Sequence, residues 1–151
     1  MNIFELLKRD HEKILKSFEE LEDAGGEVSG KQDAGQDKLF AGLKQELESH
    51  MEGEEEIFYA ELREEEDTRA LVLESYEEHH VVKALLSELE GMPKDEYWIA
   101  KLSVLRENAK HHIAKEEDDV FEEAQEILSE DQSRSMGKRM AEFKKEQMTH
   151  K

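Results

Sequence analysis

Two short stretches decide the fold and the chemistry of this sequence: His50–Glu54, which reads HMEGE, and His112–Glu116, which reads HIAKE. In each stretch a histidine is followed four residues later by a glutamate. Residues four apart lie on one face of an α-helix, so each stretch directs an imidazole and a carboxylate to the same level of the protein. Each pair also continues a stripe of apolar residues, which predicts that both pairs point inward.

Apolar residues recur at every third or fourth position along most of the chain, which is the period of an amphipathic helix. Only one proline and eight glycines interrupt 151 residues, and good helix formers dominate most segments. Asn2, Asp67 and Ser129 are predicted N-caps, and a glycine-rich loop is predicted at residues 25–35. The pattern predicts four long helices and a thinner fifth one, at about residues 2–23, 36–65, 68–90, 95–128 and 130–147.

Long helices joined by mostly short loops favour an all-α fold, an up-down antiparallel four-helix bundle with an additional short C-terminal helix. At 151 residues the chain is long enough for a single core. We therefore predict a bundle domain over residues 1–128, followed by a C-terminal helix or tail over residues 129–151. The apolar stripe of that last helix is thin, so we expect it to pack on the outside of the bundle or to fray from it.

Charge and composition exclude several classes of protein. The chain has 40 acidic and 21 basic residues, a formal net charge of −19, which repels phosphate backbones and anionic lipids. We therefore expect no nucleic-acid and no membrane partner. The absence of cysteine excludes disulfides, thiolate catalysis and Cys-ligated metal sites. No apolar run of about 18 residues and no signal peptide is recognisable, so a cytoplasmic location is expected.

Each of the four apolar stripes contains one histidine, at a position where leucine or valine is expected: His11, His50, His79 and His112. An internal repeat supports this choice. A shift of 68 residues aligns His11 with His79, and a shift of 62 residues aligns His50 with His112. The apolar residues that flank each histidine align as well. The repeat therefore predicts that these four side chains face the interior.

Two further histidines and a tyrosine lie next to the stripes. His80 and His111 are rotated by about 100° from their inward-facing neighbours, and we interpret them as solvated flanking residues or as hydrogen-bonding partners of a ligand. An alternative register turns His111 inward and pairs it with Glu116, five residues later. We favour it less than the pairing of His112 with Glu116, because it breaks the internal repeat. Tyr76 lies three residues before His79 on the same face, either as core filler or as a phenolate ligand or hydrogen-bond donor.

Four imidazoles and two carboxylates at one depth would make a poor core without a binding partner. Burial of an unpaired carboxylate is costly, and a pair of metal ions would satisfy all six groups. Imidazole suits iron, zinc and copper, and bundle cores lined by Glu and His hold two-metal sites. The predicted ligands are His11, His50, Glu54, His79, His112 and Glu116. The other acidic residues beside them are interpreted as a solvated face: Glu55, Glu117, Asp118 and Asp119.

Six short motifs combine along the chain: Asp10-His11-Glu12, His50-x3-Glu54-Glu55, Phe58-Tyr59, Glu78-His79-His80, His111-His112-x3-Glu116-Glu117 and Val120-Phe121. Together they resemble the hemerythrin-like, or HHE cation-binding, domain family over about residues 3–128. The resemblance implies a four-helix bundle with a non-haem di-iron centre, in which carboxylates and an oxo or hydroxo group bridge two iron ions. It implies bridging roles for Glu54 and Glu116 and terminal roles for the four inward histidines.

The chain departs from the oxygen-carrying hemerythrins in two places. Those proteins have a second histidine four residues after the helix-three ligand, where this chain has Lys83. Their helix-four carboxylate is typically an aspartate five residues after its histidine, whereas Glu116 follows His112 by four. One coordination position is then left to water, Tyr76, His80 or a carboxylate. Such an open position favours reactivity or sensing over reversible oxygen carriage.

The sequence supports three hypotheses for function. The first is a metal-ion binding protein that holds two iron ions and binds or senses O2, peroxide or nitric oxide, with this small oxidant as its partner. The second is a di-iron oxidase or peroxidase-like scavenger, a dedicated enzyme, which we favour less. The third is a metal-free acidic helical interaction module. Zinc or another divalent metal could replace iron in a recombinant preparation, and the physiological metal and the oligomeric state stay open.

Overall fold

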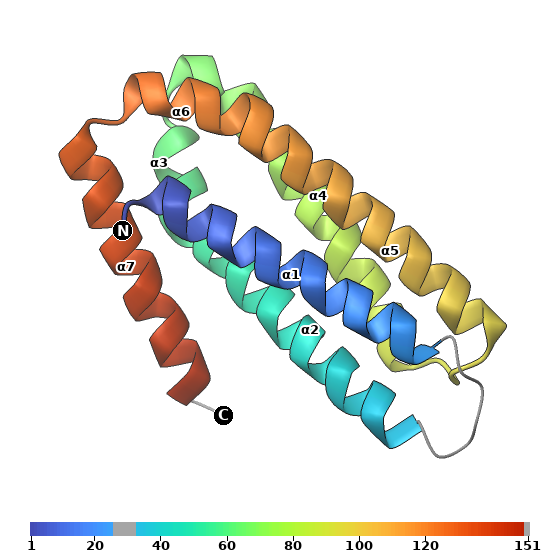
Figure 1. Cartoon of the computed structure of the whole chain (residues 1–151). Helices are drawn as coiled ribbons and strands as arrows, with labels where there is room; N and C mark the ends of the chain where they lie inside the picture. Colours follow the sequence, from blue (N-terminus) through green and yellow to red (C-terminus); the bar gives the residue numbers. More distant parts are fainter. Residues whose placement is uncertain (26–32, 150–151) are drawn as a thin grey trace.

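Four helical rods lie side by side and run alternately up and down, and a fifth helix lies at an angle against one end of them (Figure 1). The computed structural model describes residues 1–25 and 33–149. The elements are α1 (Ile3–Gly25), α2 (Asp33–Gly53), η1 (Glu54–Tyr59), α3 (Ala60–Leu62), α4 (Glu66–Glu90), α5 (Glu96–Lys115), η2 (Glu116–Val120), α6 (Phe121–Ile127) and α7 (Glu130–Thr149). The π-helical turns η1 and η2 each join two α-helices into one rod. The predicted all-α bundle with an additional C-terminal helix is confirmed.

Two of the three predicted N-caps, Asn2 and Ser129, are confirmed by their hydrogen bonds. Asn2 Oδ1 accepts a hydrogen bond from Glu5 N at 2.9 Å, and Glu5 Oε1 accepts one from Asn2 N at 3.1 Å. Ser129 Oγ accepts a hydrogen bond from the backbone N–H three residues later, at 3.1 Å. The cap predicted at Asp67 is wrong, because α4 already begins at Glu66 and its N-terminus has no side-chain cap.

The structure differs from the sequence prediction at the start of α2 and within two of the long helices. The loop predicted at residues 25–35 is too long at its end, because α2 begins at Asp33. Residues 26–32 of that loop lie outside the described part of the chain. The long helices predicted at about 36–65 and 95–128 are present, but each contains a π-helical turn that the sequence did not predict. Apolar periodicity does not reveal such turns, since it assumes 3.6 residues per turn throughout.

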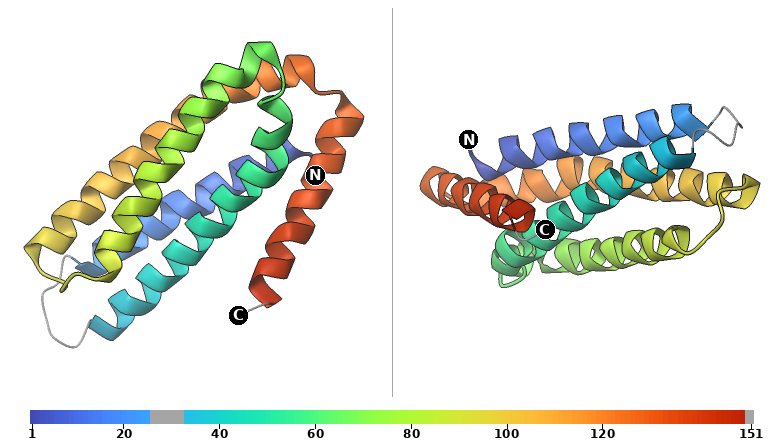
Figure 2. Two further views of the ribbon diagram at one scale, coloured as in Figure 1. Left: turned by 180° about the vertical axis from the view of Figure 1, so that it is seen from behind. Right: turned by 90° about the horizontal axis from the view of Figure 1, so that it is seen from below.

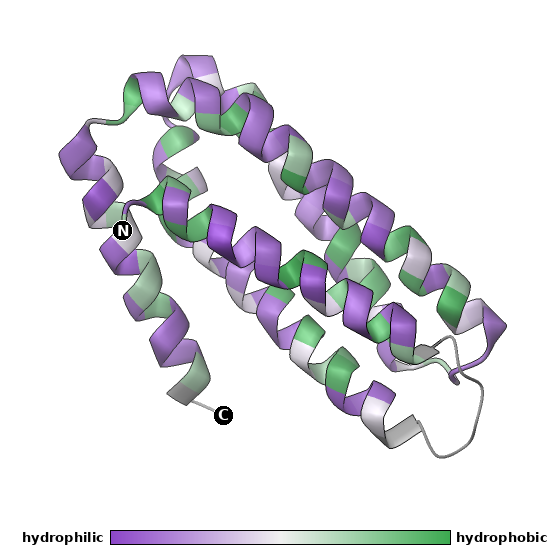
Figure 3. Ribbon diagram, viewed as in Figure 1, coloured by the Kyte–Doolittle hydropathy of each residue, from purple (hydrophilic) through white to green (hydrophobic). Residues whose placement is uncertain are grey.

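The core consists of two apolar clusters at different heights of the bundle. One lies at the end that carries η1 and η2 and includes Phe58 and Phe121, and the other lies toward the opposite end and includes Phe18 and Trp98. Hydrophilic positions predominate along the long helices, with hydrophobic positions recurring between them (Figure 3). No helix within residues 1–25 and 33–149 combines the length and the apolarity needed to cross a bilayer.

The C-terminal helix α7 packs against α1, α2 and η1 (Figure 2). Its buried contacts come from Met136 and Met140, which belong to the same apolar cluster as Phe58. Gly137 lies directly against the backbone at Met1–Ile3, so close that no Cβ fits between them. A glycine at this position therefore lets α7 approach the N-terminus of α1.

Candidate metal centre

A layer of polar side chains lies between the two apolar clusters, and it contains all six of the predicted ligands. Each comes from a different element: His11 from α1, His50 from α2, Glu54 from the first residue of η1, His79 from α4, His112 from α5 and Glu116 from the first residue of η2. All six residues are buried, and the most exposed of them, His112, is 6% accessible. The structure therefore brings these six side chains together in the interior.

The histidines of this layer form two pairs. The rings of His11 and His50 have centroids 4.9 Å apart, and those of His79 and His112 have centroids 4.7 Å apart; both pairs meet at 69°. Within the second pair the two Nε2 atoms are 3.1 Å apart. The two pairs are thus built alike, as the internal repeat of the sequence indicates.

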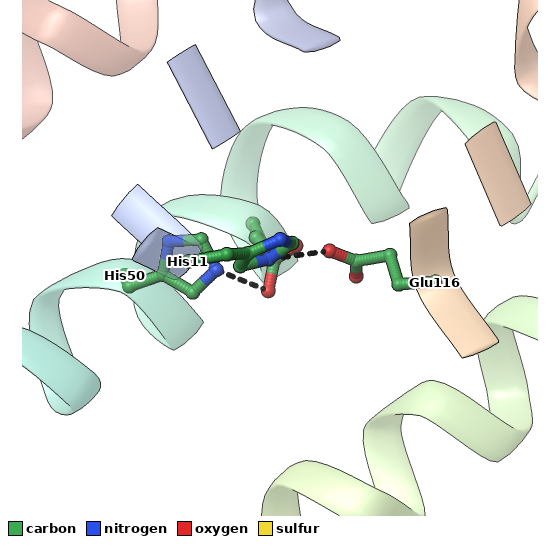
Figure 4. Close-up of side chains that lie close together, drawn as sticks. His11, His50 and Glu116 are labelled. Atoms are coloured by element: carbon green, nitrogen blue, oxygen red, sulfur yellow. Dashed lines mark ion pairs between the residues drawn. The ribbon is translucent and has the colours of Figure 1, made fainter. Parts of the chain in front are cut away.

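Each glutamate of the layer lies between the two histidine pairs. Glu54 Oε1 is 3.1 Å from His50 Nε2 and 3.2 Å from His79 Nε2. Glu116 Oε1 is 3.1 Å from His11 Nε2, and its Oε2 is 3.6 Å from His112 Nε2. Figure 4 shows Glu116 and His11 facing one another beside His50. Each carboxylate therefore contacts one histidine of each pair, as a carboxylate that bridged two ions would.

Five buried polar atoms in this layer have no hydrogen-bond partner among the described residues: Nε2 of His11 and His50, both oxygens of Glu54, and Oε1 of Glu116. Several of them lie about 3 Å from one another, but their orientation is not that of a hydrogen bond. Buried polar atoms without partners are costly. Ligand atoms about 3 Å apart are what an ion with bonds of about 2.0–2.2 Å requires.

The possible ligand atoms of the inner layer divide into two groups that could each hold a metal ion. In one group the ligand atoms of His11, His50, Glu54 and Glu116 lie within 4.8 Å of one another, and in the other those of Glu54, His79 and His112 do. Glu54 belongs to both groups. The residues present therefore fit a pair of ions, with the two histidine pairs as the separate ends of the site.

Four carboxylates form an outer ring around the inner layer, and each binds Nδ1 of one of the four inner histidines. The bonds run from His11 Nδ1 to Glu117 at 2.7 Å, from His50 Nδ1 to Asp10 at 3.1 Å, from His79 Nδ1 to Glu55 at 2.8 Å, and from His112 Nδ1 to Glu78 at 2.7 Å. With Nδ1 occupied by an outward hydrogen bond, each Nε2 points to the centre of the layer. A carboxylate behind a histidine fixes its ring and raises its basicity as a metal ligand.

The outer ring corrects one sequence-based interpretation. Glu55 and Glu117 are partly buried hydrogen-bond acceptors, whereas the sequence analysis assigned them to a solvated face; Asp118 and Asp119 are exposed as expected. The internal repeat contained the signal, because the shift of 62 residues that aligns the buried glutamates also aligns Glu55 with Glu117. A carboxylate that binds a histidine of another helix can be recognised as its partner only once the helices are assembled.

Tyr59 is a member of the site that the sequence analysis missed. Its side chain is completely buried, and its hydroxyl donates a hydrogen bond to Glu116 and lies 3.4 Å from His112 Nε2. The repeat aligns Tyr59 with Phe121, whose ring is stacked on His11 at 6.2 Å between centroids. A phenol therefore lies at one histidine pair and a plain phenyl ring at the other. In the sequence, both positions were named only within the motifs Phe58-Tyr59 and Val120-Phe121, with no role at the site.

The three alternative side chains lie outside the inner layer. The hydroxyl of Tyr76 donates to the backbone carbonyl of Glu55 at 3.4 Å, and its ring packs on Tyr59. His80 and His111 are exposed on the surface of α4 and α5. The inward orientation of His79 and His112 predicted from the repeat is confirmed, and the register with His111 inward is wrong.

The sequence profile of the hemerythrin HHE cation binding domain matches residues 2–124. The chain belongs to this family. Membership implies metal-ion binding, and the His/Glu layer of the bundle is a group of residues that could hold the metal.

Two known proteins are similar to this HHE domain. A crystal structure of a hemerythrin HHE cation binding domain-containing protein from Mycobacterium kansasii superposes with a TM-score of 0.80, covering 97% of this chain and 87% of that chain at 21% sequence identity. This likeness concerns the fold. A "DNA nickase" from Nostoc sp. (strain PCC 7120) is 27% identical over 137 residues, which are 88% of this chain and 36% of the relative. The HHE domain therefore spans about a third of that relative's length.

Charges inside the HHE domain hold protons on two of its histidines in the absence of metal. Burial lowers the pKa of His50, but the charge of Glu54 and the hydrogen bond with Asp10 raise it to about 10. Burial likewise lowers the pKa of His112, but its interactions with Glu116 and Glu78 raise it to about 10. Both rings are therefore imidazolium at neutral pH in the metal-free domain, and metal ions must displace these protons.

A small apolar cavity adjoins the histidines on the side away from Tyr59. Its volume is about 20 Å³, and its walls are three of the histidines, His50, His79 and His112, with apolar side chains that include Ile14 and Val82. About 10–15 Å³ suffices for one water molecule. The cavity therefore has room for a molecule of two or three atoms and offers it few polar partners apart from the imidazoles.

Proposed function

We propose that this HHE domain is a non-haem di-iron protein that binds or senses O2 or a related small oxidant such as peroxide or nitric oxide. The four inner histidines would be terminal ligands, and Glu54 and Glu116 would bridge the two ions together with an oxo or hydroxo group. The observation that carries the proposal is the position of these glutamates, each of which contacts one histidine of each pair.

Bound iron would supply one-electron redox chemistry and an open position for the small molecule. The protein contributes the remaining requirements. The outer carboxylates hold every imidazole in the tautomer that presents Nε2 to the centre. The apolar cavity beside the histidines favours a small, weakly polar molecule over bulk water. Lys83, at the position of an additional ligand in oxygen carriers, instead pairs with Glu55 at 3.1 Å, which favours sensing over carriage.

One observation favours the second candidate, a di-iron oxidase or peroxidase-like scavenger. Tyr59 holds an O–H group at the edge of the inner layer opposite the apolar cavity, where it can donate a hydrogen bond to an oxygen atom of an oxidant bound on that side of the layer. Multiple turnovers of peroxide by the iron-loaded protein would support a scavenger. A single stoichiometric oxidation would support binding or sensing.

The proposal is tested by anaerobic reconstitution with ferrous iron. We expect two irons per chain and near-ultraviolet charge-transfer absorption after exposure to O2. The control variant is the double substitution His50→Leu and His112→Leu, which removes one ligand from each pair and should hold no stoichiometric iron. Wild-type protein without stoichiometric iron, and with the same thermal stability as the double variant, would instead support the metal-free interaction module. Zinc in a protein as purified would not contradict the proposal, because recombinant sites often take the available ion.

We further propose that this domain acts in the cytoplasm, without a nucleic-acid or membrane partner. The similar protein from Nostoc is named as a DNA nickase, but about two thirds of that relative lies outside the similar region. The net charge of −19 opposes binding to a phosphate backbone. Fluorescence anisotropy with a labelled duplex at low salt tests this, and saturable submicromolar binding would contradict it.

A further inference from the structure

The outer carboxylates of the two halves of the site are held by different parts of the chain. Glu78, which orients His112, accepts a hydrogen bond from Lys115 Nζ at 3.3 Å. Its counterpart in the repeat is Asp10, which orients His50 and accepts a hydrogen bond from Lys144 of α7. A lysine from the C-terminal helix thus takes the role that a lysine of the bundle itself has in the other half.

The repeat explains why the lysine must come from elsewhere. The shift of 62 residues that aligns His50 with His112 aligns Gly53 with Lys115. Gly53 has no side chain, and a Cβ built there would collide with the Met140 side chain of α7. The glycine therefore leaves no local cation for Asp10 and at the same time makes space for α7.

We propose that Lys144 is a positioning residue for His50, which makes α7 part of the metal centre. Asp10 is 1% exposed, so its carboxylate depends on protein groups for its hydrogen bonds. One oxygen binds His50 Nδ1 and the other binds Lys144, so the lysine fixes the orientation of the carboxylate that fixes the imidazole. This inference rests on the proposed function, because it concerns the ion held by His11 and His50.

Competition titration of the metal-free full chain with Zn²⁺, against a chromophoric chelator, tests the inference by resolving two dissociation constants. In Lys144→Gln we expect one constant to rise about tenfold, the low end of the effect of partners behind a ligand, and the other to stay within about twofold. Lys144→Arg should restore the raised constant to within about twofold of the wild-type value. The matched control is Lys145→Gln, the exposed neighbour, which should change neither constant.

Further readouts separate positioning from simple loss of packing. With Co²⁺ as the probe, the visible d–d bands of one of the two ions should change in Lys144→Gln, whereas detachment of α7 alone would lower the melting temperature and leave these bands unchanged. The inference is overturned if both constants stay within twofold of wild type, if both rise equally, or if Lys145→Gln has the same effect. Wild-type protein that binds fewer than two ions would overturn the proposed function and this inference together, so the two failures are distinguishable.

Discussion

The half of the centre that contains His11 and His50 and the half that contains His79 and His112 have the same backbone plan but different surroundings. In both, two rings meet at 69° and each ring is held by a carboxylate from another helix. The first half has the phenyl ring of Phe121 and a lysine from α7, and the second has the phenol of Tyr59 and a lysine from α5. The repeated helix pairs thus produce two similar ion positions, and a few unrepeated side chains make them inequivalent.

The largest expected effect is loss of the ion from one half of the centre while the other half keeps its ion. His50→Leu should lower the binding of the ion in the first half by more than about 100-fold, because it removes a ligand and not only its partner. His112→Leu should do the same in the second half. Metal analysis after removal of loosely bound ions should give about one ion per chain for each single variant. Loss of both ions in both variants would show that the halves do not bind independently.

The next effect concerns Glu117, the outer carboxylate for which the described part of the chain provides no lysine. Glu117 holds His11 at 2.7 Å, faces a surface groove of about 460 Å³ and, among the described residues, pairs with no lysine. Glu117→Gln should lower the affinity for one ion by about 10- to 100-fold, since an amide fixes and polarises the imidazole less well than a carboxylate. Asp118→Asn is the matched control, because Asp118 is exposed and adjacent. Equal zinc affinities for these two variants would contradict the assignment.

The helices and the six inner residues could be predicted because both depend on periodicity along a single helix. A histidine and a glutamate four residues apart share a face whatever the neighbouring helices do. The outer carboxylates could not be predicted in this way, because Glu55 and Glu117 each bind a histidine of another helix. Both glutamates also lie in π-helical turns, where an extra residue per turn changes which side chains face inward.

Tyr59 was missed for a related reason. It follows Ile57 and Phe58 in η1, and three consecutive buried residues do not fit one face of a regular α-helix. Its polar tip reaches the inner layer only because η1 turns it toward Glu116. Sequence patterns therefore predict the layer and its depth, whereas the differences between its halves depend on local departures from helix geometry.

The pH dependence of the metal-free protein tests whether both halves retain their protons. His50 and His112 have folded-state pKa values of about 10, above the ordinary histidine pKa of 6.5. The folded state therefore binds more protons than the unfolded state between these values. This stabilisation is complete below about pH 6.5 and is lost as the pH rises through about 10.

The melting temperature of chelator-treated protein should consequently fall from pH 6.5 to 10. Each kcal/mol of lost stability lowers it by about 2–4 °C at this chain length. Circular dichroism melts of wild type and of the variant with both His50→Leu and His112→Leu isolate the effect, because the variant lacks the two groups. A slope as steep in the variant as in wild type would show that other groups cause the fall. Saturation with zinc should reduce the slope, since ligating imidazoles are neutral.

The smallest expected effect on metal binding comes from a substitution that makes the two halves more alike. Tyr59→Phe replaces the phenol by the ring type that the repeat places in the other half, and removes one buried hydrogen bond to Glu116. Burial and the charges of Glu116 and Glu54 raise the pKa of Tyr59, so in the metal-free protein the group removed is a neutral donor. Denaturant unfolding of that protein should therefore show a loss of about 1.5–3 kcal/mol, the usual contribution of a hydrogen bond to a charged group. Two zinc ions should still bind, because no proposed ligand changes; a variant that holds only one ion would instead make Tyr59 a ligand of the second half.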